Sequence, residues 1–341
     1  MRIQRWEPGD ERIAAECHAV HLAAHRVDEP HEPPMSAGTF GLHLTEGWEQ
    51  APGEVWIVTD AVPFADTATG EAVAGYCRLD LPDLENRERA FGQPVVHPAY
   101  RRRGIGRELL RHAAARAAAG ERTTLDSFAL EDSAGDAFAH AVGAKLSLEE
   151  VRRVQYLRKI PPGKVAELRE SAARAAAGYS LVSWTGPLPD EYLAGAAKVF
   201  NAHNDAPHPA GVEEESWDAD RVRERTGAAV RAGLMRGHGL AAIHDATGEM
   251  AGFTVVLVDP ESPEWGHQQL TAVTRAHRGH RLGLLVKTAM LELLAEAEPQ
   301  LEQIETGNAA ANEHMIAVNE ALGYEVLKPG FKFYEMPVDK I

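Results

Sequence analysis

The chain repeats itself once, and this duplication limits its possible fold more than any other feature of the sequence. Laying the second half on the first with a shift of 177 or 178 positions brings identical residues together in the same order. The matched pairs are Trp6 and Trp184, His25 and His203, Asp28 and Asp205, Pro30 and Pro207, Gly75 and Gly252, Arg101 and Arg278, and Gly106 and Gly283. A period of this length is that of a whole domain rather than of a solenoid repeat.

The two copies meet in a short segment rich in proline and glycine, Lys159-Ile160-Pro161-Pro162-Gly163, which is typical of a domain boundary. The Ala/Glu/Arg-rich stretch over 164–177 predicts a linker helix that Gly178 ends. The 341 residues suit two domains of about 170 residues each. We therefore predict an N-terminal domain over 1–160, a linker helix within 161–177 and a C-terminal domain over 178–341.

Composition and charge exclude several classes of protein. The formal net charge of −16 argues against a nucleic-acid or anionic-membrane partner, because such partners require a basic face. No run approaches 18 apolar residues, so we expect no membrane span. The chain begins without the apolar segment of a signal peptide, and its two cysteines form no zinc or disulfide pattern. We expect a cytoplasmic protein without a bound metal.

Each copy has the element order of a mixed α/β domain. A short strand (3–6 or 180–184) precedes a helix (10–24 or 190–202), with Asp10 and Asp190 as expected N-caps. A Pro-rich loop (27–34 or 204–209) leads to a hairpin (54–60 with 72–79, or 239–244 with 250–258) around a Thr-Gly-Glu turn. A strand ending at 95–96 or 270–273, a long helix from Gly104 or Arg281, and a strand (123–130 or 303–306) then predict a crossover with one parallel strand pair. A short helix and a last strand (148–158 or 331–336) close each copy.

Two basic turns carry the chemistry of the sequence. Residues 95–106 read VVHPAYRRRGIG, and residues 271–283 read TAVTRAHRGHRLG, each between a strand and a helix. A helix N-terminus presents unpaired backbone N–H groups to an anion. Glycines let a phosphate approach the backbone, and arginines add positive charge. These turns therefore predict binding of a polyanion such as a diphosphate. They lack the Gly-Lys-Ser/Thr of a P-loop and the G-x-G-x-x-G of a dinucleotide site.

The first turn resembles the cofactor loop of the GNAT superfamily of N-acetyltransferases, Q/R-x-x-G-x-G/A after a strand ending V-x-P. Arg101, Gly104 and Gly106 match it fully, whereas in the second copy Arg281 stands where the first glycine is usual. The resemblance covers nearly the whole chain in a tandem form and implies acetyl-CoA as the co-substrate. It implies cofactor contacts at Val96, Arg101, Arg102, Arg103, Gly104, Ile105, Gly106 and Arg107, and at Val273, Arg278, Gly279, His280, Arg281, Leu282 and Gly283.

A second segment, from Thr306 to Tyr324, resembles the family's region near the pantetheine arm and thiol. The resemblance implies that Asn308 and Asn312 contact the cofactor. The tyrosine that usually protonates the leaving thiolate would stand at position 319, but this chain has Asn319, and the first copy has Ala139. An asparagine donates a hydrogen bond but supplies no proton, so solvent, Tyr324 or Tyr334 would have to serve.

In this family an amine attacks the acyl thioester directly between two splayed parallel strands. The resemblance implies an oxyanion donor on the strand before each loop, near Val96 or Val273. The amine must lose a proton. Candidate bases are Glu264 and His267 in the second copy, and Glu85 and Glu88 in the first.

The predicted function is transfer of an acetyl group from acetyl-CoA to the amine of a small molecule, by a monomer or homodimer. We expect the C-terminal copy to be catalytic, although the first copy has the more complete cofactor loop. Two alternatives stay open at this point. The chain could be a non-catalytic acyl-CoA-binding sensor, which the missing tyrosines favour, or an acetyltransferase for peptides or proteins.

Overall fold

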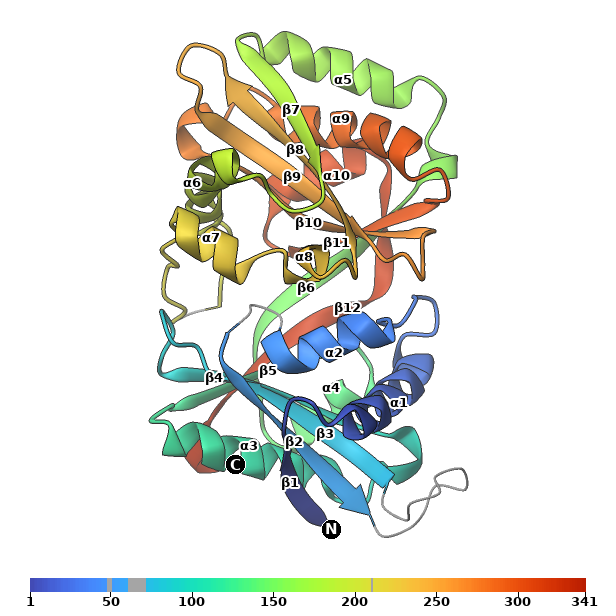
Figure 1. Ribbon diagram of the computed structural model, residues 1–341, viewed down its shortest axis with the longest axis vertical. Helices are drawn as coiled ribbons and strands as arrows, with labels where there is room; N and C mark the ends of the chain where they lie inside the picture. The colour runs from blue at the N-terminus through green and yellow to red at the C-terminus, as the bar shows by residue number, and fades with distance from the viewer. Residues whose placement is uncertain (48–50, 61–71, 210) are drawn as a thin grey trace. The chain divides into compact units, whose positions relative to one another are not determined.

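The computed structural model describes residues 1–47, 51–60, 72–209 and 211–341. They form two compact units (Figure 1). The first unit comprises residues 1–149 together with 331–341, and the second comprises residues 150–330.

The first unit is built on a mixed sheet. Its strand order is β1 (Arg2–Trp6), β2 (Gly53–Asp60), β3 (Ala72–Asp80), β4 (Arg89–Val96), β5 (Thr124–Leu130) and β12 (Tyr324–Pro337, of which 331–337 belong to this unit). β4 and β5 are parallel, whereas the other neighbours are antiparallel. The parallel pair lies where the sequence predicts a crossover.

Helices cover both faces of this sheet, because neighbouring residues of a strand point to opposite sides. The helices are α1 (Glu11–Asp28), α2 (Ala37–Glu46), α3 (Ile105–Ala119) and α4 (Ala134–Ala141). Ile57 of β2 packs in a core with Ile13 of α1 and Phe40 of α2. The next residue, Val58, belongs to a second core with Leu109 of α3. The predicted cap is confirmed, since the Asp10 carboxylate accepts from the Ile13 amide at 3.1 Å.

The second unit repeats this plan. Its strand order is β6 (Lys145–Tyr156, of which 150–156 belong to this unit), β11 (Gln303–Ala309), β10 (Trp265–Val273), β9 (Met250–Val258), β8 (Arg236–His244) and β7 (Tyr179–Thr185). β10 and β11 form its parallel pair. The predicted mixed α/β class with two related copies is thus confirmed.

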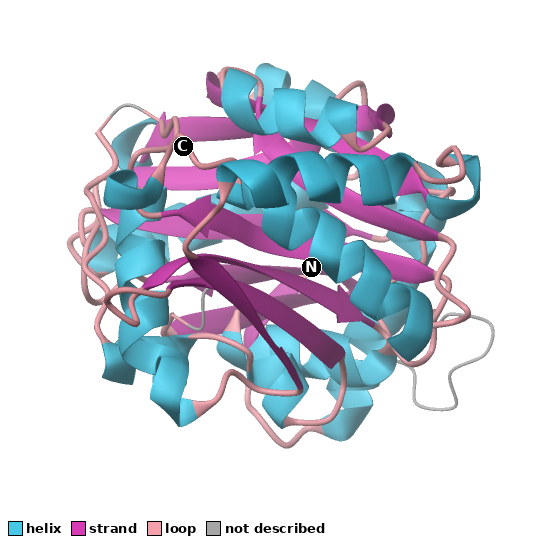
Figure 2. Cartoon of the chain, turned by 90° about the horizontal axis from the view of Figure 1, so that it is seen from above, coloured by secondary structure: helices cyan, strands magenta, loops and turns pink. Residues whose placement is uncertain are grey.

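Helices also pack in cores on both faces of the second sheet. Figure 2 shows helices on both sides of the strands. They are α5 (Lys164–Ala175), α6 (Leu193–His203), α7 (Ala219–Arg225), α8 (Ala228–Arg231), α9 (Leu282–Ala297) and α10 (Glu313–Ala321). The predicted linker helix is α5, and its Leu168 and Ala172 pack in one core with α9. Asp190 does not cap α6, because it begins a 3-10 turn (Asp190–Tyr192) that separates it from the helix.

The last strand of each copy pairs with the sheet of the other copy. Residues 150–156 of β6 run antiparallel to β11 in the second unit, and residues 331–337 of β12 run antiparallel to β5 in the first. The predicted boundaries at 1–160 and 178–341 follow the duplication in the sequence, whereas the compact units follow this exchange. Sequence periodicity gives no sign of the exchange, because it identifies a strand but not the strand with which it pairs.

Three helices lie in segments where the sequence predicts no helix: α2, α7 and α8. The first Thr-Gly-Glu turn, at 69–71, falls outside the described residues. The second is present, with Gly248 at a φ of 70°. No helix within the described ranges is both long and apolar enough to span a bilayer.

Candidate active site

Each parallel strand pair separates after a short stretch of pairing. β4 and β5 pair only from Arg89 with Thr124 to Phe91 with Asp126. β10 and β11 likewise pair only from Trp265 to His267. We call the diverging stretches the first splay (92–96 and 127–130) and the second splay (268–273 and 306–309). Each splay leads to one of the two basic turns.

The two turns have the same backbone shape, with glycine and arginine exchanged. The first has positive φ at Arg102 (65°) and Gly104 (86°), and the second has it at Gly279 (87°) and Arg281 (56°). Arg281 therefore adopts the left-handed conformation that Gly104 adopts without a steric penalty. Both residues sit directly before a helix, so that the amides of the first turn of α3 or α9 are free to bind an anion.

The arginines that match between the two turns, Arg101 and Arg278, brace their loops. The Arg101 guanidinium donates to both oxygens of Asp28, at 3.0 and 2.6 Å, and its Nε donates to the Val96 carbonyl. Arg278 donates in the same way to Asp205 at 2.7 Å and to the Val273 carbonyl. The charge of Arg101 is thus balanced by its own carboxylate, whereas Arg278 shares Asp205 with Arg275.

The other cations differ between the turns. In the first, the Arg103 guanidinium lies 5.0 Å from the centre of the Tyr100 ring, while Arg102 and Arg107 have no recorded ion pair among the described residues. In the second, Arg281 donates to Ser171 at 2.7 Å and His280 contacts the Ala175 carbonyl. The first turn therefore offers more positive charge to a ligand.

The glycine inside each helix start leaves room for a ligand. A Cβ atom at Gly283 would meet no atom within 4 Å, and at Gly106 it would make only ordinary contact with Phe138 at 3.6 Å. The preceding residues, Ile105 and Leu282, are buried in the cores, so they offer only backbone groups. The turns thus fit the diphosphate of coenzyme A through main-chain amides.

The splays differ in the backbone donors that face them. In the first unit the His97 amide donates to the Ala74 carbonyl of β3. Backbone N–H groups alternate in direction along an antiparallel strand, so the backbone nitrogens of Val96 and Pro94 face the splay instead. Proline has no N–H, so this splay lacks a donor at that position. In the second unit the Thr274 amide donates to the Ala251 carbonyl of β9. The same alternation directs the N–H groups of Val273 and Thr271 toward the splay.

A β-bulge accompanies these donors in the second unit only. The register of β10 against β9 shifts between Gln268 and Thr271, whereas β4 pairs with β3 without a shift. Buried side chains hold the bulge: the Gln268 amide donates to the Val255 carbonyl at 2.7 Å, and the Thr254 and Thr271 hydroxyls lie 2.7 Å apart. Bulges commonly re-aim groups beside active sites.

Titratable side chains meet at the base of the second splay, on the sheet face opposite α9. His267 is 36% exposed, and its Nδ1 lies 3.9 Å from the Glu305 carboxylate. Arg152 is 1% exposed and donates to the same carboxylate at 2.7 Å. Desolvation lowers the pKa of His267, although Glu305 partly opposes this shift. The imidazole is therefore neutral near pH 7 and able to accept a proton.

The same positions in the first unit carry phenylalanines. Phe91 stands at the end of the strand pairing as His267 does, and it stacks on Phe128 with 5.8 Å between ring centres. Phe128 pairs across strands with Phe333, just as Gly307 pairs with Arg152 in the second unit. The aromatic pair covers this face of the first splay, whereas Gly307 places no side chain on the second, where a Cβ would lie 3.0 Å from the Glu150 carboxylate.

The remaining predicted residues of the second copy have different surroundings. Asn312 caps α10 by accepting from the Met315 amide. Asn319 is fully buried and bonds to Asn308 at 2.7 Å. Tyr324 is buried, and burial raises the pKa of its hydroxyl. Glu264 is exposed and precedes β10, where its backbone carbonyl accepts from the Glu302 and Gln303 amides.

The remaining candidates from the sequence lie away from the second splay. Tyr334 belongs to the first unit, where its hydroxyl donates to Asp136. In the first copy, Glu85 and Glu88 lie in the segment between β3 and β4, before the paired end of the splay. No group of three or more His, Cys, Asp or Glu side chains in the described part of the chain is arranged to hold a metal ion.

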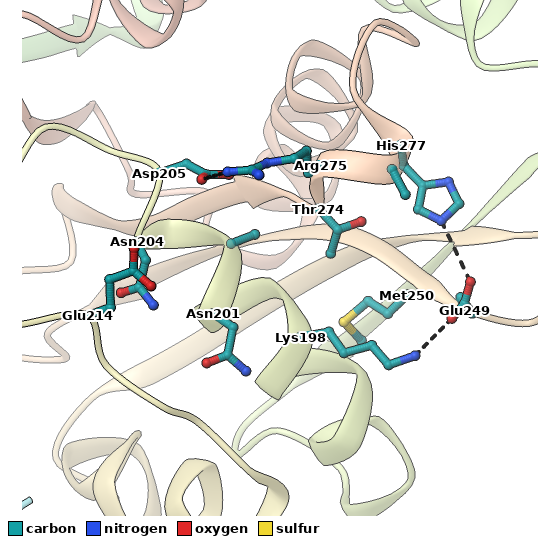
Figure 3. Close-up of a pocket in the computed structure, with 12 residues that line it drawn as sticks. Lys198, Asn201, Asn204, Asp205, Glu214, Glu249, Met250, Thr274, Arg275 and His277 are labelled. Atoms are coloured by element: carbon teal, nitrogen blue, oxygen red, sulfur yellow. Dashed lines mark hydrogen bonds and ion pairs between the residues drawn. The ribbon is translucent and has the colours of Figure 1, made fainter.

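A hollow of about 550 Å³ lies beside the second turn (Figure 3). Glu249 lies between Lys198 at 2.8 Å and His277 at 3.9 Å, and Asp205 pairs with Arg275 on the other side. The charges lining this hollow are thus largely paired with one another.

The sequence reasoning missed Thr271, Arg152, Glu305 and Lys287 as candidate site residues. Lys287 could have been noticed, because it stands in the almost wholly apolar run of α9. Nothing in the sequence could have indicated Arg152 as a site residue. It belongs to the first copy of the repeat and lies in the second unit only because the last strands are exchanged.

Comparisons with known proteins agree with this geometry. A sequence profile described as "Acetyltransferase (GNAT) domain" matches residues 51–141. The mycothiol acetyltransferase of Tsukamurella paurometabola is 32% identical over 246 residues, covering 70% of this chain and 77% of that protein. The mycothiol acetyltransferase of Mycobacteroides abscessus is 30% identical over 267 residues, covering 75% and 79%.

A solved tandem GNAT protein from the clavulanic acid biosynthesis pathway, in a form without acetyl-CoA, is similar over both units. Its TM-score is 0.79 at 29% identity, and the match covers 99% of this chain and 98% of that one. The relatives, the profile and the two splayed units together show that this chain is an acetyltransferase of the GNAT family, in its tandem two-domain form.

Proposed function

We propose that the second unit transfers an acetyl group from acetyl-CoA to the amine of a small molecule, and that the first unit binds an acyl-CoA without turning it over. One observation carries this proposal. At matching positions the second splay has His267, the N–H of Thr271 and Gly307, whereas the first has Phe91, Pro94 and Phe128.

In the proposed reaction the amine nitrogen attacks the thioester carbonyl carbon directly. The N–H groups of Thr271 and Val273 stabilise the oxyanion as it forms. His267 accepts the proton that the amine loses, and Glu305 stabilises the resulting imidazolium. The C–N bond forms and the C–S bond breaks. The thiolate takes a proton from solvent, because Asn319 holds no ionisable proton.

The amine class follows from the family and from the site. The relatives are named mycothiol acetyltransferases, and we extend to this chain only the class of a small-molecule amine acceptor. A neutral imidazole beside Glu305 suits an acceptor that arrives as an ammonium ion and must be deprotonated.

Calorimetric titration of acetyl-CoA into wild type, Gly106→Glu and Gly283→Glu tests this division of roles. A carboxylate at either glycine repels the diphosphate, while the added Cβ has room in the fold. We expect each variant to lose one binding site. Release of free coenzyme A with a panel of amines should cease in Gly283→Glu and persist in Gly106→Glu. The reverse pattern would assign catalysis to the first unit.

A further inference from the structure

A buried lysine with no carboxylate partner among the described residues lies beneath the second splay. Lys287, in the middle of α9, is 3% exposed. Its ammonium donates to the Asn319 side-chain oxygen at 2.7 Å and lies 4.6 Å from the centre of the Tyr324 ring. Burial alone lowers the pKa of Lys287 to about 7. Such a group is costly to keep in a core, which indicates that it does more than fill space.

The lysine fixes the direction of a chain of hydrogen bonds. A protonated lysine can only donate, so the oxygen of Asn319 faces the ammonium, as the structure shows. The Asn319 NH₂ group then donates to the oxygen of Asn308 at 2.7 Å. The oxygens of Asn319 and Asn308 thus both accept within this chain of hydrogen bonds. The NH₂ group of Asn308 is therefore directed away from α10. Without Lys287, either amide could turn over and exchange its donor for its acceptor.

The chain ends at the second splay. Asn308 belongs to the part of β11 that no longer pairs with β10, and it is only half-buried. Its side chain lies on the sheet face of α9 and α10, because it bonds to Asn319 of α10. A donor at this position faces whatever passes between the diverging strands from the turn at the start of α9.

The first unit has the same three positions without any polar group. Leu110, like Lys287, stands five residues after the start of its helix, at Ile105 or Leu282. Ala129, like Asn308, is five residues beyond the first paired residue of its strand. Ala139, like Asn319, stands four residues before the glycine that follows its helix. An apolar trio is thus compatible with the fold, so the polar chain is not required for folding.

We propose that Lys287 is a positioning residue, which acts through Asn319 to hold the Asn308 NH₂ group toward a carbonyl of the pantetheine arm in the second splay. This inference rests on the proposed function of the second unit. It names a residue for co-substrate binding that touches neither the co-substrate nor the acceptor.

A double-mutant cycle in the Gly106→Glu background tests the inference, because only the second site then binds. Loss of one hydrogen bond of about 1 kcal/mol corresponds to roughly a fivefold change in Kd. We expect Lys287→Met and Asn308→Ala each to raise the Kd of acetyl-CoA by about fivefold. The double variant should bind no worse than Asn308→Ala alone, because Lys287 acts only through Asn308.

Binding of 3′-phosphoadenosine 5′-diphosphate, the nucleotide half of coenzyme A, provides a readout that general damage would also change. It carries the diphosphate but lacks the arm, so its Kd should be the same in all these variants. Lys159→Met is the matched control, because it removes an equal charge from an exposed position of the same unit. It should leave both dissociation constants unchanged.

A triple variant covers the case in which Lys287→Met does not fold. Lys287→Leu with Asn319→Ala and Asn308→Ala copies the apolar trio of the first unit and leaves no buried amide unpaired. It should unfold at or above the wild-type temperature and bind acetyl-CoA like Asn308→Ala. Additive effects in the cycle, or wild-type affinity in Lys287→Met, overturn the inference. Absence of binding in the Gly106→Glu parent instead overturns the proposed function.

Discussion

The two splays have the same frame but opposite chemistry. Each follows three pairs of parallel residues and leads to a turn with two left-handed positions and a braced arginine. Around this frame, His267 replaces Phe91, Gly307 replaces Phe128, and Arg152 replaces Phe333. The duplication has therefore kept the same turn in both units, while the groups that we propose for catalysis are present in one.

The polar groups of the second unit are energetically costly to bury. Arg152 and Lys287 are almost completely buried, and buried charges are costly unless they are paired or hydrogen-bonded. The corresponding positions of the first unit are filled by aromatic or aliphatic side chains, which need no partner. At these matched positions only the second unit carries polar groups, which supports the proposal that this unit uses them for its chemistry.

The largest effect is expected from His267→Ala. Removal of a general base lowers kcat/KM by about 10²- to 10⁴-fold. The acid limb of wild-type kcat/KM should lie below the ordinary histidine pKa of 6.5, because desolvation lowers the pKa of His267 and the base is lost only when it is protonated. This acid limb should be absent in the variant. Phe91→Ala, the matched change in the first unit, should leave turnover unchanged. A persisting limb in His267→Ala would point to another base, such as Glu264.

The next largest effect concerns the backbone donor. Thr271→Pro copies Pro94 of the first unit and should lower kcat by about 10²- to 10³-fold, as loss of an oxyanion-hole donor does. Thr271→Ala is its control: it keeps the N–H and removes only the hydroxyl that contacts Thr254. Steady-state kinetics with both variants separates the donor from the bulge. Equal losses in the two would mean that the hydroxyl, and not the N–H, matters.

Gly307→Phe should close the second splay as Phe128 closes the first. We expect kcat/KM to fall by about 100-fold, because the acceptor can no longer reach the reacting geometry. The Kd of acetyl-CoA should stay the same, since the contacts that we propose for the co-substrate, at Asn308 and the second turn, lie on the other sheet face. Gly307→Ala adds only the Cβ, which would lie 3.0 Å from the Glu150 carboxylate. If the alanine variant loses as much activity as the phenylalanine variant, crowding at Glu150 explains the effect instead.

The sequence could predict the parts of this comparison that depend on local pattern. The repeat and the Arg101 and Arg278 motifs located both turns, and the helix starts agree with the structure to within a residue. It could not predict what depends on contacts between distant segments. The exchange of β6 and β12 places Arg152 beside Glu305, and the packing of α9 on α10 places Lys287 beside Asn319. Periodicity identifies a buried face but not the element that covers it.

The smallest expected difference lies in the braces of the two turns. The pair of Arg101 and Asp28 is less exposed than that of Arg278 and Asp205, with arginine side chains 22% and 44% exposed. Exposed pairs are screened by water and salt and stabilise little. We therefore expect Asp28→Ala to weaken acetyl-CoA binding at the first site by about fivefold, and Asp205→Ala to weaken the second by about twofold or less.

Calorimetry in the Gly283→Glu and Gly106→Glu backgrounds, respectively, measures each brace separately. The Asp205 pair also holds Arg275, whose hydrogen bond is the main cause of the lowered pKa of Asp205. Release of Arg275 and Arg278 in Asp205→Ala would add free positive charge beside the diphosphate, which opposes the loss of order in the turn. A tighter second site in this variant at low salt, vanishing at high salt, would show that charge outweighs loop geometry there.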